Sequence, residues 1–394
     1  KLNMRMGLNS FSAHEVINKL NKDELTKIFK FYGDEKDARK ISQGILKKRF
    51  KNLLTTKDLV DDNYTLHYTD GALLRTIYHN GLTVNQGRNG MMKFHDWMPN
   101  YEISDLDVGT QTYHAEALGK AIGMSNLWVT FHGYWPEKNG LCPTGSFKDM
   151  EAVPTIQRLK DHDCRGVICA SAGNTARAFS HFCDLENFPL IVVVADIHAQ
   201  RIWRSGPSIH DCVKVVVVEN GNYADAKIVA KEIASKLDGW QLEGGAHNIA
   251  RRDGIGSLIL DAWNEIGRMP DHYFQAVGGG PGPIGVYEMM QRLIDFRLDE
   301  GPLAKIHLSQ NPEHCPIHNA WKAGRTNLID SDFPLGNVSV YSDYLLSASP
   351  AYGVKGGVFD LFRIVNLVTS ISISPVGMFL FFEDRSITTP FICI

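Results

Sequence analysis

Residues 166–184 read GVICASAGNTARAFSHFCD, and this stretch joins three kinds of segment. Its first five residues are apolar, as in a strand that is buried on both faces of a sheet. The next five, residues 171–175, are small and mostly polar, as in a loop. The remainder places apolar residues at helical spacing. A buried strand, a polar loop and a helix, in that order, form the repeating unit of a parallel α/β sheet.

The same unit recurs along the chain, where short β-branched runs alternate with helical patterns. The expected strands cover residues 166–171, 190–195, 213–219 and 272–279, and the expected helices cover residues 175–184, 222–237, 257–267 and 284–296. We therefore predict an α/β fold with a parallel sheet that helices cover on both faces. Ligands bind at the carboxyl ends of the strands in such sheets, so the loops after the strands are candidate sites.

The loop SAGNTA, residues 171–176, follows the first of these strands. Its small residues let a ligand approach the backbone, and Ser171, Asn174 and Thr175 offer hydroxyl and amide groups. The free N–H groups of the following helix favour an anion. The alternative is an ordinary helix start, with Asn174 or Ser171 as its N-cap.

The loop GGGPGP, residues 278–283, follows another expected strand and precedes a helix. A strand, a glycine-rich loop and a helix N-terminus can together cradle a phosphate. The loop is not the nucleoside-triphosphate motif, and its match to a dinucleotide motif is weak. The alternative is a tight turn between strand and helix with no ligand.

Lys148 lies in LCPTGSFKDM, residues 141–150, behind a Pro-Thr-Gly-Ser turn. A partly desolvated lysine at the edge of a parallel sheet has a lowered pKa and reacts with aldehydes. The alternative is a surface lysine paired with Asp149. One lysine, one asparagine-bearing loop and one glycine loop in a single α/β unit suit pyridoxal 5′-phosphate, an aldehyde with a phosphate tail that a lysine holds as a Schiff base.

These three motifs resemble the fold-type II pyridoxal-phosphate enzymes, which include threonine synthase and the tryptophan synthase β chain. The resemblance implies two α/β domains with parallel sheets, Lys148 as the cofactor-bearing lysine and Asn174 at the 3′-hydroxyl of the cofactor. The resemblance assigns the cofactor phosphate to Gly278, Gly279, Gly280 and Gly282, and the substrate carboxylate to Ser171, Gly173 and Thr175. No metal is implied.

Within this family the Ser-Phe-Lys-Asp motif is similar to the threonine synthase branch, and segments between residues 55 and 365 are most similar to the cysteate synthases. The resemblance implies a β-replacement in coenzyme M biosynthesis: O-phospho-L-serine and sulfite give L-cysteate and phosphate. Lys148 would also take the Cα proton as a general base. The alternative within the family is threonine synthase chemistry, in which O-phosphohomoserine gives threonine and phosphate.

Two features of the site stay open at this point. Arg251, Arg252 and Lys355 are candidates to bind the substrate phosphate or sulfite, by charge and by position in the matching segments. Pro281 stands where the family often has threonine or glycine, and proline removes one N–H donor from the phosphate loop.

Residues 1–51 look helical and basic, with Ser12 or Asn21 as N-caps. They resemble an internal fragment of the bacterial 16S rRNA (cytosine-N4)-methyltransferases, on the Met-Arg-Met at 4–6 and the Tyr-Gly-Asp-Glu at 32–35. No glycine loop for S-adenosylmethionine precedes this fragment, so we expect a fused remnant. The alternative is an RNA-binding segment attached to an inactive scaffold of the pyridoxal-phosphate fold.

We expect three segments along the chain. Residues 1–51 form the basic helical segment, residues 52–365 the catalytic unit of two α/β subdomains, and residues 366–394 a divergent hydrophobic tail. Alternating apolar and polar residues at 63–82 and 92–104 predict half-buried strands. Residues 364–382 are uncharged and long enough to span a bilayer, but their serines and Pro375 favour a buried segment or a poorly folded tail. This tail offers no equivalent of the family's hydroxyl near the pyridine nitrogen.

Composition excludes several classes of protein. The chain of 394 residues has a formal net charge of −3, which argues against nucleic acid and membrane surfaces as partners. Its seven cysteines include no Cys-x-x-Cys pair, which argues against a zinc site and a disulfide framework and suits a cytoplasmic location. The expected partners are a small-molecule amino-acid phosphate ester and sulfite. Family members are often dimers, so a homo-oligomer is expected from the resemblance.

Overall fold

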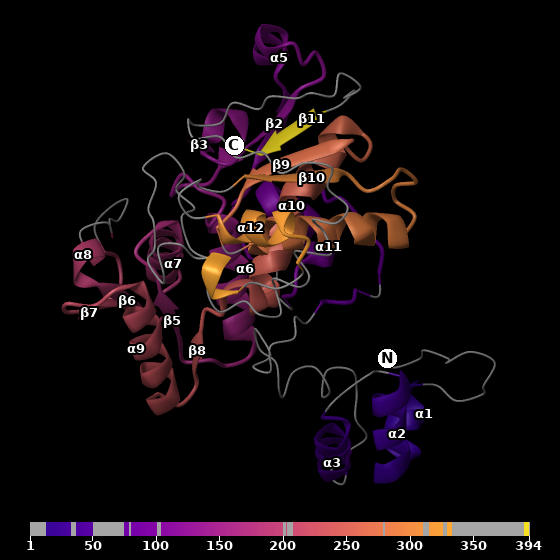
Figure 1. Cartoon of the computed structure of the whole chain (residues 1–394), viewed down its shortest axis with the longest axis vertical. Coiled ribbons are helices and arrows are strands. Elements are labelled where there is room, and N and C mark those ends of the chain that lie inside the picture. Colours follow the sequence, from indigo (N-terminus) through magenta and orange to yellow (C-terminus); the bar gives the residue numbers. More distant parts are fainter. Residues whose placement is uncertain are drawn as a thin grey trace. The chain divides into compact units, whose positions relative to one another are not determined.

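The computed structural model divides the chain into two compact units, residues Lys1–Thr65 and Leu66–Ile394 (Figure 1). The structure describes residues 13–32, 37–49, 75–78, 80–100, 104–199, 202, 208–278, 280–309, 315–325, 329–332 and 390–393. Residues 364–382 and Lys355, which the sequence singled out, lie outside this part. Within it, the structure contains no helix that is both long and apolar enough to cross a membrane.

The described residues of the first unit form three helices, in line with the helical character expected for residues 1–51. They are α1 (Ala13–Lys19), α2 (Lys22–Tyr32) and α3 (Ala38–Arg49). Leu25 and Ile45 form the centre of a small apolar core between them. Asn21 caps α2: its Oδ1 accepts hydrogen bonds from the N–H groups of Asp23 and Glu24, and Glu24 Oε2 accepts one from the Asn21 N–H. This reciprocal arrangement is a capping box and confirms the expected N-cap.

The second unit has a four-stranded sheet in the order β7-β6-β5-β8, and every neighbouring pair is parallel. Its strands are β5 (Gly166–Ala170), β6 (Leu190–Ala195), β7 (Val213–Val218) and β8 (Trp240–Leu242). Val167 and Cys169 pack into the core that includes α7 (Asn174–Leu185), whereas Ile168 packs toward α9 (Tyr223–Lys236). Successive side chains of β5 thus meet helices on opposite faces, which explains its continuous apolar run.

A second, five-stranded sheet has the order β1-β2-β11-β9-β10. Its strands are β1 (Gln111–His114), β2 (Trp128–Phe131), β9 (His272–Ala276), β10 (Lys305–Ser309) and β11 (Pro390–Cys393). Strands β2, β11, β9 and β10 are parallel, whereas β1 runs antiparallel to β2 at the edge. The predicted α/β class with parallel sheets is therefore confirmed, with one antiparallel edge strand that the sequence pattern did not indicate.

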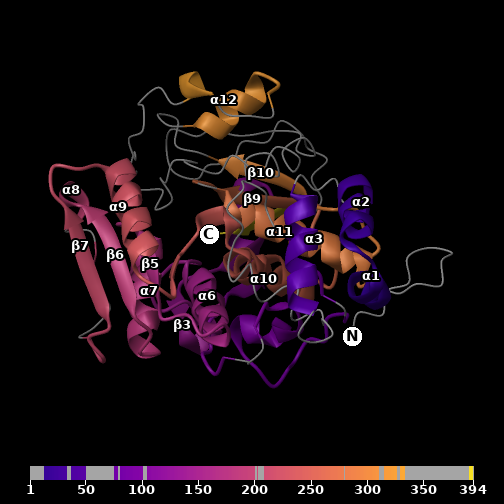
Figure 2. The same ribbon diagram turned by 90° about the horizontal axis from the view of Figure 1, so that it is seen from below.

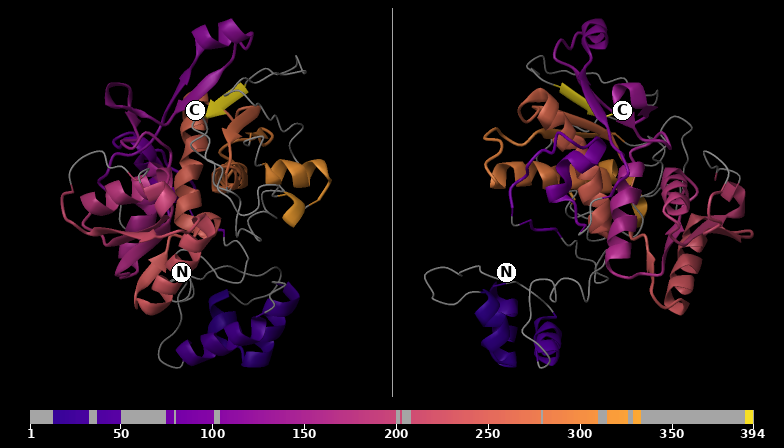
Figure 3. Two further views of the ribbon diagram at one scale, coloured as in Figure 1. Left: turned by 60° about the vertical axis from the view of Figure 1, so that its left-hand side comes forward. Right: turned by 180° about the vertical axis from the view of Figure 1, so that it is seen from behind.

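Three helices pack together in the larger unit: α6 (Asp149–Asp161), α10 (Ile249–Ile266), which leads from β8 of one sheet to β9 of the other, and α11 (Pro281–Asp295). Helix α10 packs against α6, α11 and the first two strands of the five-stranded sheet, and Figures 2 and 3 show it between the two sheets. Close approach requires glycine here. A Cβ on Gly254 would overlap the carbonyl oxygen of Met150 on α6, and a Cβ on Gly285 of α11 would overlap that of Arg252 on α10.

The remaining elements are short and lie on loops and edges. They are η1 (Gly90–Trp97), α5 (Glu116–Ile122), β3 (Tyr134–Trp135), η2 (Pro136–Lys138), β4 (Gly140–Leu141), α8 (Asp196–Ala199), η3 (Gly245–His247), α12 (Pro316–Lys322) and η4 (Asp330–Asp332). The strand predicted within residues 92–104 is wrong, because residues 92–97 belong to η1. Met91, Met92, Phe94 and Trp97 are all buried there, so a compact turn of helix buries more apolar surface than an alternating strand would.

Candidate active site

The loop before α6 holds Lys148 in a fixed position. Gly145 adopts a left-handed conformation with φ of 75°, which glycine accepts without strain. The carboxylate of Asp149 then accepts hydrogen bonds from both the N–H group and the hydroxyl of Thr144, at 2.9 Å for the N–H group. Lys148 is the N-cap residue of α6, with helical backbone angles. Asp149 therefore stabilises the turn that presents Lys148.

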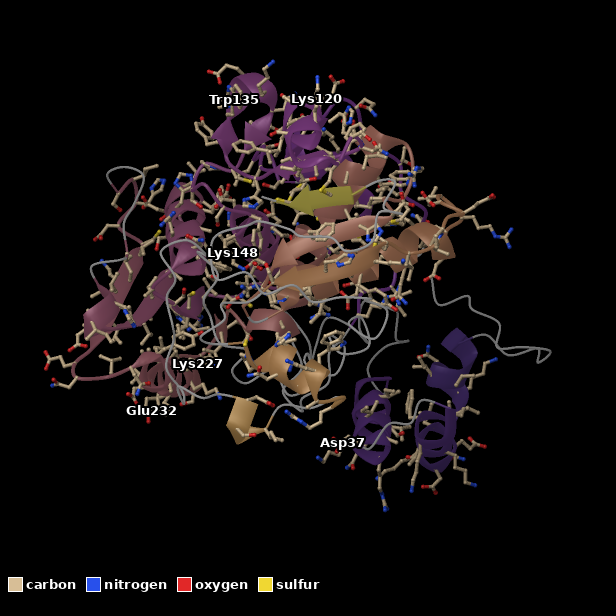
Figure 4. All side chains as sticks on the ribbon, turned by 45° about the horizontal axis from the view of Figure 1, so that its top comes forward. Asp37, Lys120, Trp135, Lys148, Lys227 and Glu232 are labelled. Carbon is tan, nitrogen blue, oxygen red and sulfur yellow. The ribbon has the colours of Figure 1, made fainter. Side chains whose placement is uncertain are left out.

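The side chain of Lys148 points into the protein, with 15% of its surface exposed (Figure 4). Its Nζ lies 4.5 Å from the centre of the Phe147 ring and forms an ion pair with Glu151 Oε1, one helical turn further along α6. Burial lowers the pKa of Lys148 from its usual value, while the charge of Glu151 acts in the opposite direction. The alternative of a surface lysine paired with Asp149 is therefore wrong, because Lys148 is mostly buried and pairs with Glu151.

Glu151 is fully buried and has a second cationic partner. Its Oε2 lies 2.6 Å from Arg251 Nε on α10, in an ion pair that lacks the alignment of a hydrogen bond. Arg251 in turn pairs through Nη1 with Glu243 Oε1, just after β8. Burial raises the pKa of Glu151. Burial alone would lower the pKa of Arg251, but the carboxylates of Glu151 and Glu243 raise it. Basic and acidic side chains thus alternate in a row from Lys148 through Glu151 and Arg251 to Glu243.

The loop after β5 leaves room for a ligand. Ser171 Oγ accepts a hydrogen bond from the Gly173 N–H at 3.2 Å, and Asn174 is buried. The N-cap of α7 is Gly173, and within the described part of the chain no side chain caps this helix end. The N-cap role considered for Asn174 or Ser171 is therefore wrong. A Cβ on Gly173 would meet no described atom within 4 Å, so open space borders this position.

The Lys148 loop and the loop after β5 are neighbours. Arg177, in the first turns of α7, donates a hydrogen bond from Nη1 to the carbonyl oxygen of Thr144 at 3.2 Å. The N–H group of Glu243 donates to the carbonyl oxygen of Ile168 on β5 at 2.9 Å, which places the Glu243 end of the charge chain at the same sheet. Two of the three predicted motifs therefore meet at the carboxyl end of β5.

The glycine loop leads from β9 to the N-terminus of α11. Gly280 has φ of 88° and is the N-cap, and Pro281 follows in the first turn of the helix, where a missing N–H is tolerated. A Cβ on Gly282 would overlap the side-chain amide of Gln275, so a larger residue there would require Gln275 to move. Gly278 is half-buried, and Gly279 lies outside the described residues. This loop connects to Lys148 through the closely packed helices α11, α10 and α6.

Two of the arginines expected to bind a substrate anion are engaged inside the fold. Arg251 pairs with Glu151 and Glu243, as described above. Arg252 is fully buried and donates from Nε to Glu288 Oε2 at 3.2 Å and from Nη1 to the carbonyl oxygen of Ala246. Because both guanidinium groups already face protein acceptors, the structure argues against their use as substrate anion sites.

Sequence reasoning missed Glu151 and Glu243 as members of this site. Glu151 could have been found from its i, i+3 spacing to Lys148, since such residues are neighbours on a helix. That signal depends on recognising residues 149–161 as a helix, which the Gly/Pro-marked loop before it obscured. Glu243 carries no local signal, because its pairing with Arg251 depends on how β8 and α10 pack.

The described residues fit pyridoxal phosphate on three observations. Lys148 is a buried amine with a lowered pKa, which suits a nucleophile toward an aldehyde. Open space borders Gly173, beside the buried Asn174. A glycine loop that ends at a helix N-terminus suits a phosphate. Among the described residues there is no cluster of three side chains that could hold a metal ion.

Comparison with protein families gives two matches. Residues 103–346 match the pyridoxal-phosphate dependent enzyme family, which covers both sheets up to β10 and the three motifs above. Residues 1–66 match the MraW methylase family, so the methyltransferase-like character expected for residues 1–50 extends to the end of the first unit.

Curated relatives are similar over most of the chain. Cysteate synthase of Methanocella arvoryzae is 43% identical over 309 residues, which cover 77% of this chain and 74% of that protein. Cysteate synthase of Methanosarcina barkeri is 41% identical over 296 residues, which cover 74% and 71% of the two chains.

Solved structures support the fold. Maize serine racemase has a TM-score of 0.51 at 16% identity and covers 67% of this chain and 71% of its own. The processed form of threonine deaminase isoform 2 from Solanum lycopersicum has a TM-score of 0.50 at 17% identity and covers 77% and 80%. At these identities the likeness concerns the fold alone.

Proposed function

The chain belongs to the pyridoxal-phosphate-dependent enzymes and, within them, to the cysteate synthase family, and on this premise we propose that it converts O-phospho-L-serine and sulfite into L-cysteate and phosphate. The observation that carries the proposal is the 43% identity to a cysteate synthase over 309 residues. In this β-replacement the Cβ–O bond to phosphate breaks and a bond from Cβ to the sulfur of sulfite forms. The Cα proton leaves before the Cβ–O bond breaks and returns after the Cβ–S bond has formed.

Lys148 has two roles in this proposal. Its amine would hold the cofactor through the aldehyde group, and the same amine, once free, would take the proton from Cα and later return it. The cofactor, when bound, serves as an electron sink for the charge that develops at Cα. The buried position of Lys148 supports both roles, because a desolvated amine is neutral, and therefore reactive, at a lower pH than an exposed one.

The loop after β5 is proposed to bind the substrate carboxylate. The first turn of α7 contains no acidic residue, and its N–H groups can bind an anion together with the hydroxyls of Ser171 and Thr175. Gly173 keeps the space beside them open. Asn174 is proposed to contact the ring hydroxyl of the cofactor, and Gly278, Gly279, Gly280 and Gly282 its phosphate.

The proposal is tested with the purified full chain, pyridoxal phosphate and O-phospho-L-serine, with and without sulfite. Mass spectrometry measures L-cysteate, and a colorimetric assay measures released phosphate. We expect cysteate only when both substrates are present, in amounts equal to the phosphate released. O-phosphohomoserine is assayed in parallel, because formation of threonine from it would replace the proposal by threonine synthase chemistry. A chain that binds the cofactor but turns over neither substrate would support an inactive scaffold.

A further inference from the structure

The carboxylate of Glu151 lies between two cations inside the second unit. Lys148 contacts its Oε1 from the start of the same helix, and Arg251 contacts its Oε2 from α10 at 2.6 Å. Glu151 has no exposed surface, and the side chains of Lys148 and Arg251 are only 15% and 8% exposed. Burying a carboxylate costs desolvation free energy, which the attraction of the two cations must offset.

Arg251 and Glu243 fix the orientation of Glu151. The guanidinium of Arg251 pairs through Nη1 with Glu243, and the backbone N–H of Arg251 donates to Oδ1 of Asn248, the N-cap of α10, at 3.1 Å. Asn248 also donates from Nδ2 to the carbonyl oxygen of Glu243 at 2.8 Å, so Asn248 contacts both Arg251 and Glu243. Arg251 therefore contacts Glu151 at Oε2, and Lys148 contacts it at Oε1.

The other groups around Lys148 do not compete for its proton. His132, which follows β2, packs edge-on against Phe147 at 5.3 Å between ring centres. Burial lowers its pKa to about 4, so it is neutral near pH 7. Asp149 is bound to Thr144 on the opposite side of the turn. Glu151 is therefore the carboxylate that faces the Lys148 amine, with Arg251 and Glu243 behind it.

From this geometry we infer that Glu151 is a positioning residue for Lys148: its carboxylate holds the amine whenever Lys148 is not bonded to the cofactor, and favours the protonated form of that amine. The charge of Arg251 favours the ionised form of Glu151 against the effect of burial, and Glu243 pairs with Arg251 on its other side. This inference rests on the proposed role of Lys148 in the reaction. In that reaction, Glu151 would stabilise the protonated amine of Lys148 after Lys148 has taken the Cα proton. It would also keep this amine close to Cα, which must receive the proton back.

The test measures the protonation of Lys148 directly, in the full chain after the cofactor has been removed with hydroxylamine. Acetic anhydride labels neutral amines, so mass spectrometry of the Lys148 peptide across a pH series gives the pH at which half of Lys148 is protonated. An opposite charge in contact shifts such a midpoint by about 1–3 pH units. We expect Glu151→Gln to lower the midpoint by this amount, and Glu151→Asp, which keeps the charge, to restore much of it.

Glu288→Gln is the matched control. Glu288 is also a buried carboxylate paired with an arginine, Arg252, but it lies on α11. We expect this variant to leave the Lys148 midpoint unchanged. An unchanged midpoint in Glu151→Gln, or an equal shift in both variants, would overturn the inference. If Glu151→Gln does not fold, Glu243→Gln replaces it and should lower the midpoint by a smaller amount, because it leaves the charge of Arg251 less compensated; an unchanged midpoint there would also overturn it.

Two further results separate this inference from the proposed function. A midpoint that shifts as expected in a chain with no turnover supports the role of Glu151 and overturns the reaction. Turnover with a midpoint that Glu151→Gln does not move supports the reaction and overturns the role of Glu151. In an active enzyme, Glu151→Gln should lower kcat and leave the KM for O-phospho-L-serine nearly unchanged, because Glu151 faces Lys148 and not the substrate-binding loop.

Discussion

Lys148 pairs with Glu151, one turn along α6, and not with its neighbour Asp149 in the sequence. The two acidic residues, Asp149 and Glu151, have different partners. Asp149 binds Thr144 and fixes the turn before Lys148, whereas Glu151 faces the amine itself. The side chain of Lys148 is only 15% exposed, so its amine is largely withdrawn from water.

The first prediction concerns Lys148→Ala. Without the amine, no covalent bond to pyridoxal phosphate can form and no base stands at Cα, so we expect loss of the visible absorption band of the bound cofactor. We also expect turnover to fall by at least about 100-fold. Lys160→Ala is the control, because Lys160 lies on the same helix and pairs with Glu186 at its other end. A visible band that persists in Lys148→Ala would show that another lysine bears the cofactor.

The second prediction concerns Arg251→Gln. This change removes the cation between the fully buried Glu151 and the partly buried Glu243, and leaves Lys148 as the cationic partner of Glu151. Breaking a buried ion pair in this way costs about 3–5 kcal/mol, so the free energy of unfolding should fall by that amount. Urea unfolding at pH 7 measures the loss.

An exposed pair provides the comparison for Arg251. Arg165 lies 3.8 Å from Asp238, and both side chains are mostly exposed. Exposed ion pairs contribute little, so Arg165→Gln should unfold at nearly the same urea concentration as the unaltered chain. Equal losses in the two variants would mean that the pairing of Arg251 contributes no more than a surface contact.

The sequence predicted the framework of the larger unit because its signals there are local. β5, β6 and β7 begin at the expected residues, since continuous β-branched runs can be buried only in a covered parallel sheet. β9 ends at Ala276, three residues before the expected end, because Gly278 already belongs to the loop. The loops after β5 and β9 were also predictable, since small residues between a strand and a helix have few other uses.

Other parts of the fold and the site could not be predicted in this way. β8 has three residues, and β10 contains Lys305 and His307, so neither forms an apolar run. β11 is added to the centre of its sheet from the end of the chain, a placement that only tertiary packing decides. The pairing of Arg251 with Glu151 and Glu243 also depends on tertiary packing. From its charge alone, Arg251 was expected to bind a substrate anion, but in the folded chain it binds two carboxylates of the protein.

The third prediction concerns pH and Asp149. Burial raises the pKa of Asp149 to about 7, well above its value of about 4 in an unfolded chain. Between these values the folded state keeps a proton that the unfolded state has lost, so this group makes the free energy of unfolding fall as the pH rises from about 4 to about 7. In Asp149→Asn this contribution is absent, and the fall should be less steep by up to about 1.4 kcal/mol per pH unit.

Urea unfolding at several pH values between 4 and 8 measures both slopes. Asp105→Asn is the control, because Asp105 is almost fully exposed and pairs only loosely with Arg88 at 3.4 Å. Its slope should match that of the unaltered chain. If Asp149→Asn also leaves the slope unchanged, Asp149 is ionised throughout this range and the hydrogen bonds from Thr144 outweigh the effect of burial.

The fourth prediction concerns Gly173→Ala, which separates the fold from the binding site. The added methyl group would meet no described atom within 4 Å, so the free energy of unfolding should change by less than about 0.5 kcal/mol. The same group would enter the space proposed for the substrate carboxylate and should raise the KM for O-phospho-L-serine by about tenfold, equivalent to about 1.4 kcal/mol. Gly254→Ala is the contrasting control, because its methyl group would overlap the carbonyl oxygen of Met150 and should destabilise the fold. A KM that Gly173→Ala leaves unchanged would place the substrate carboxylate elsewhere.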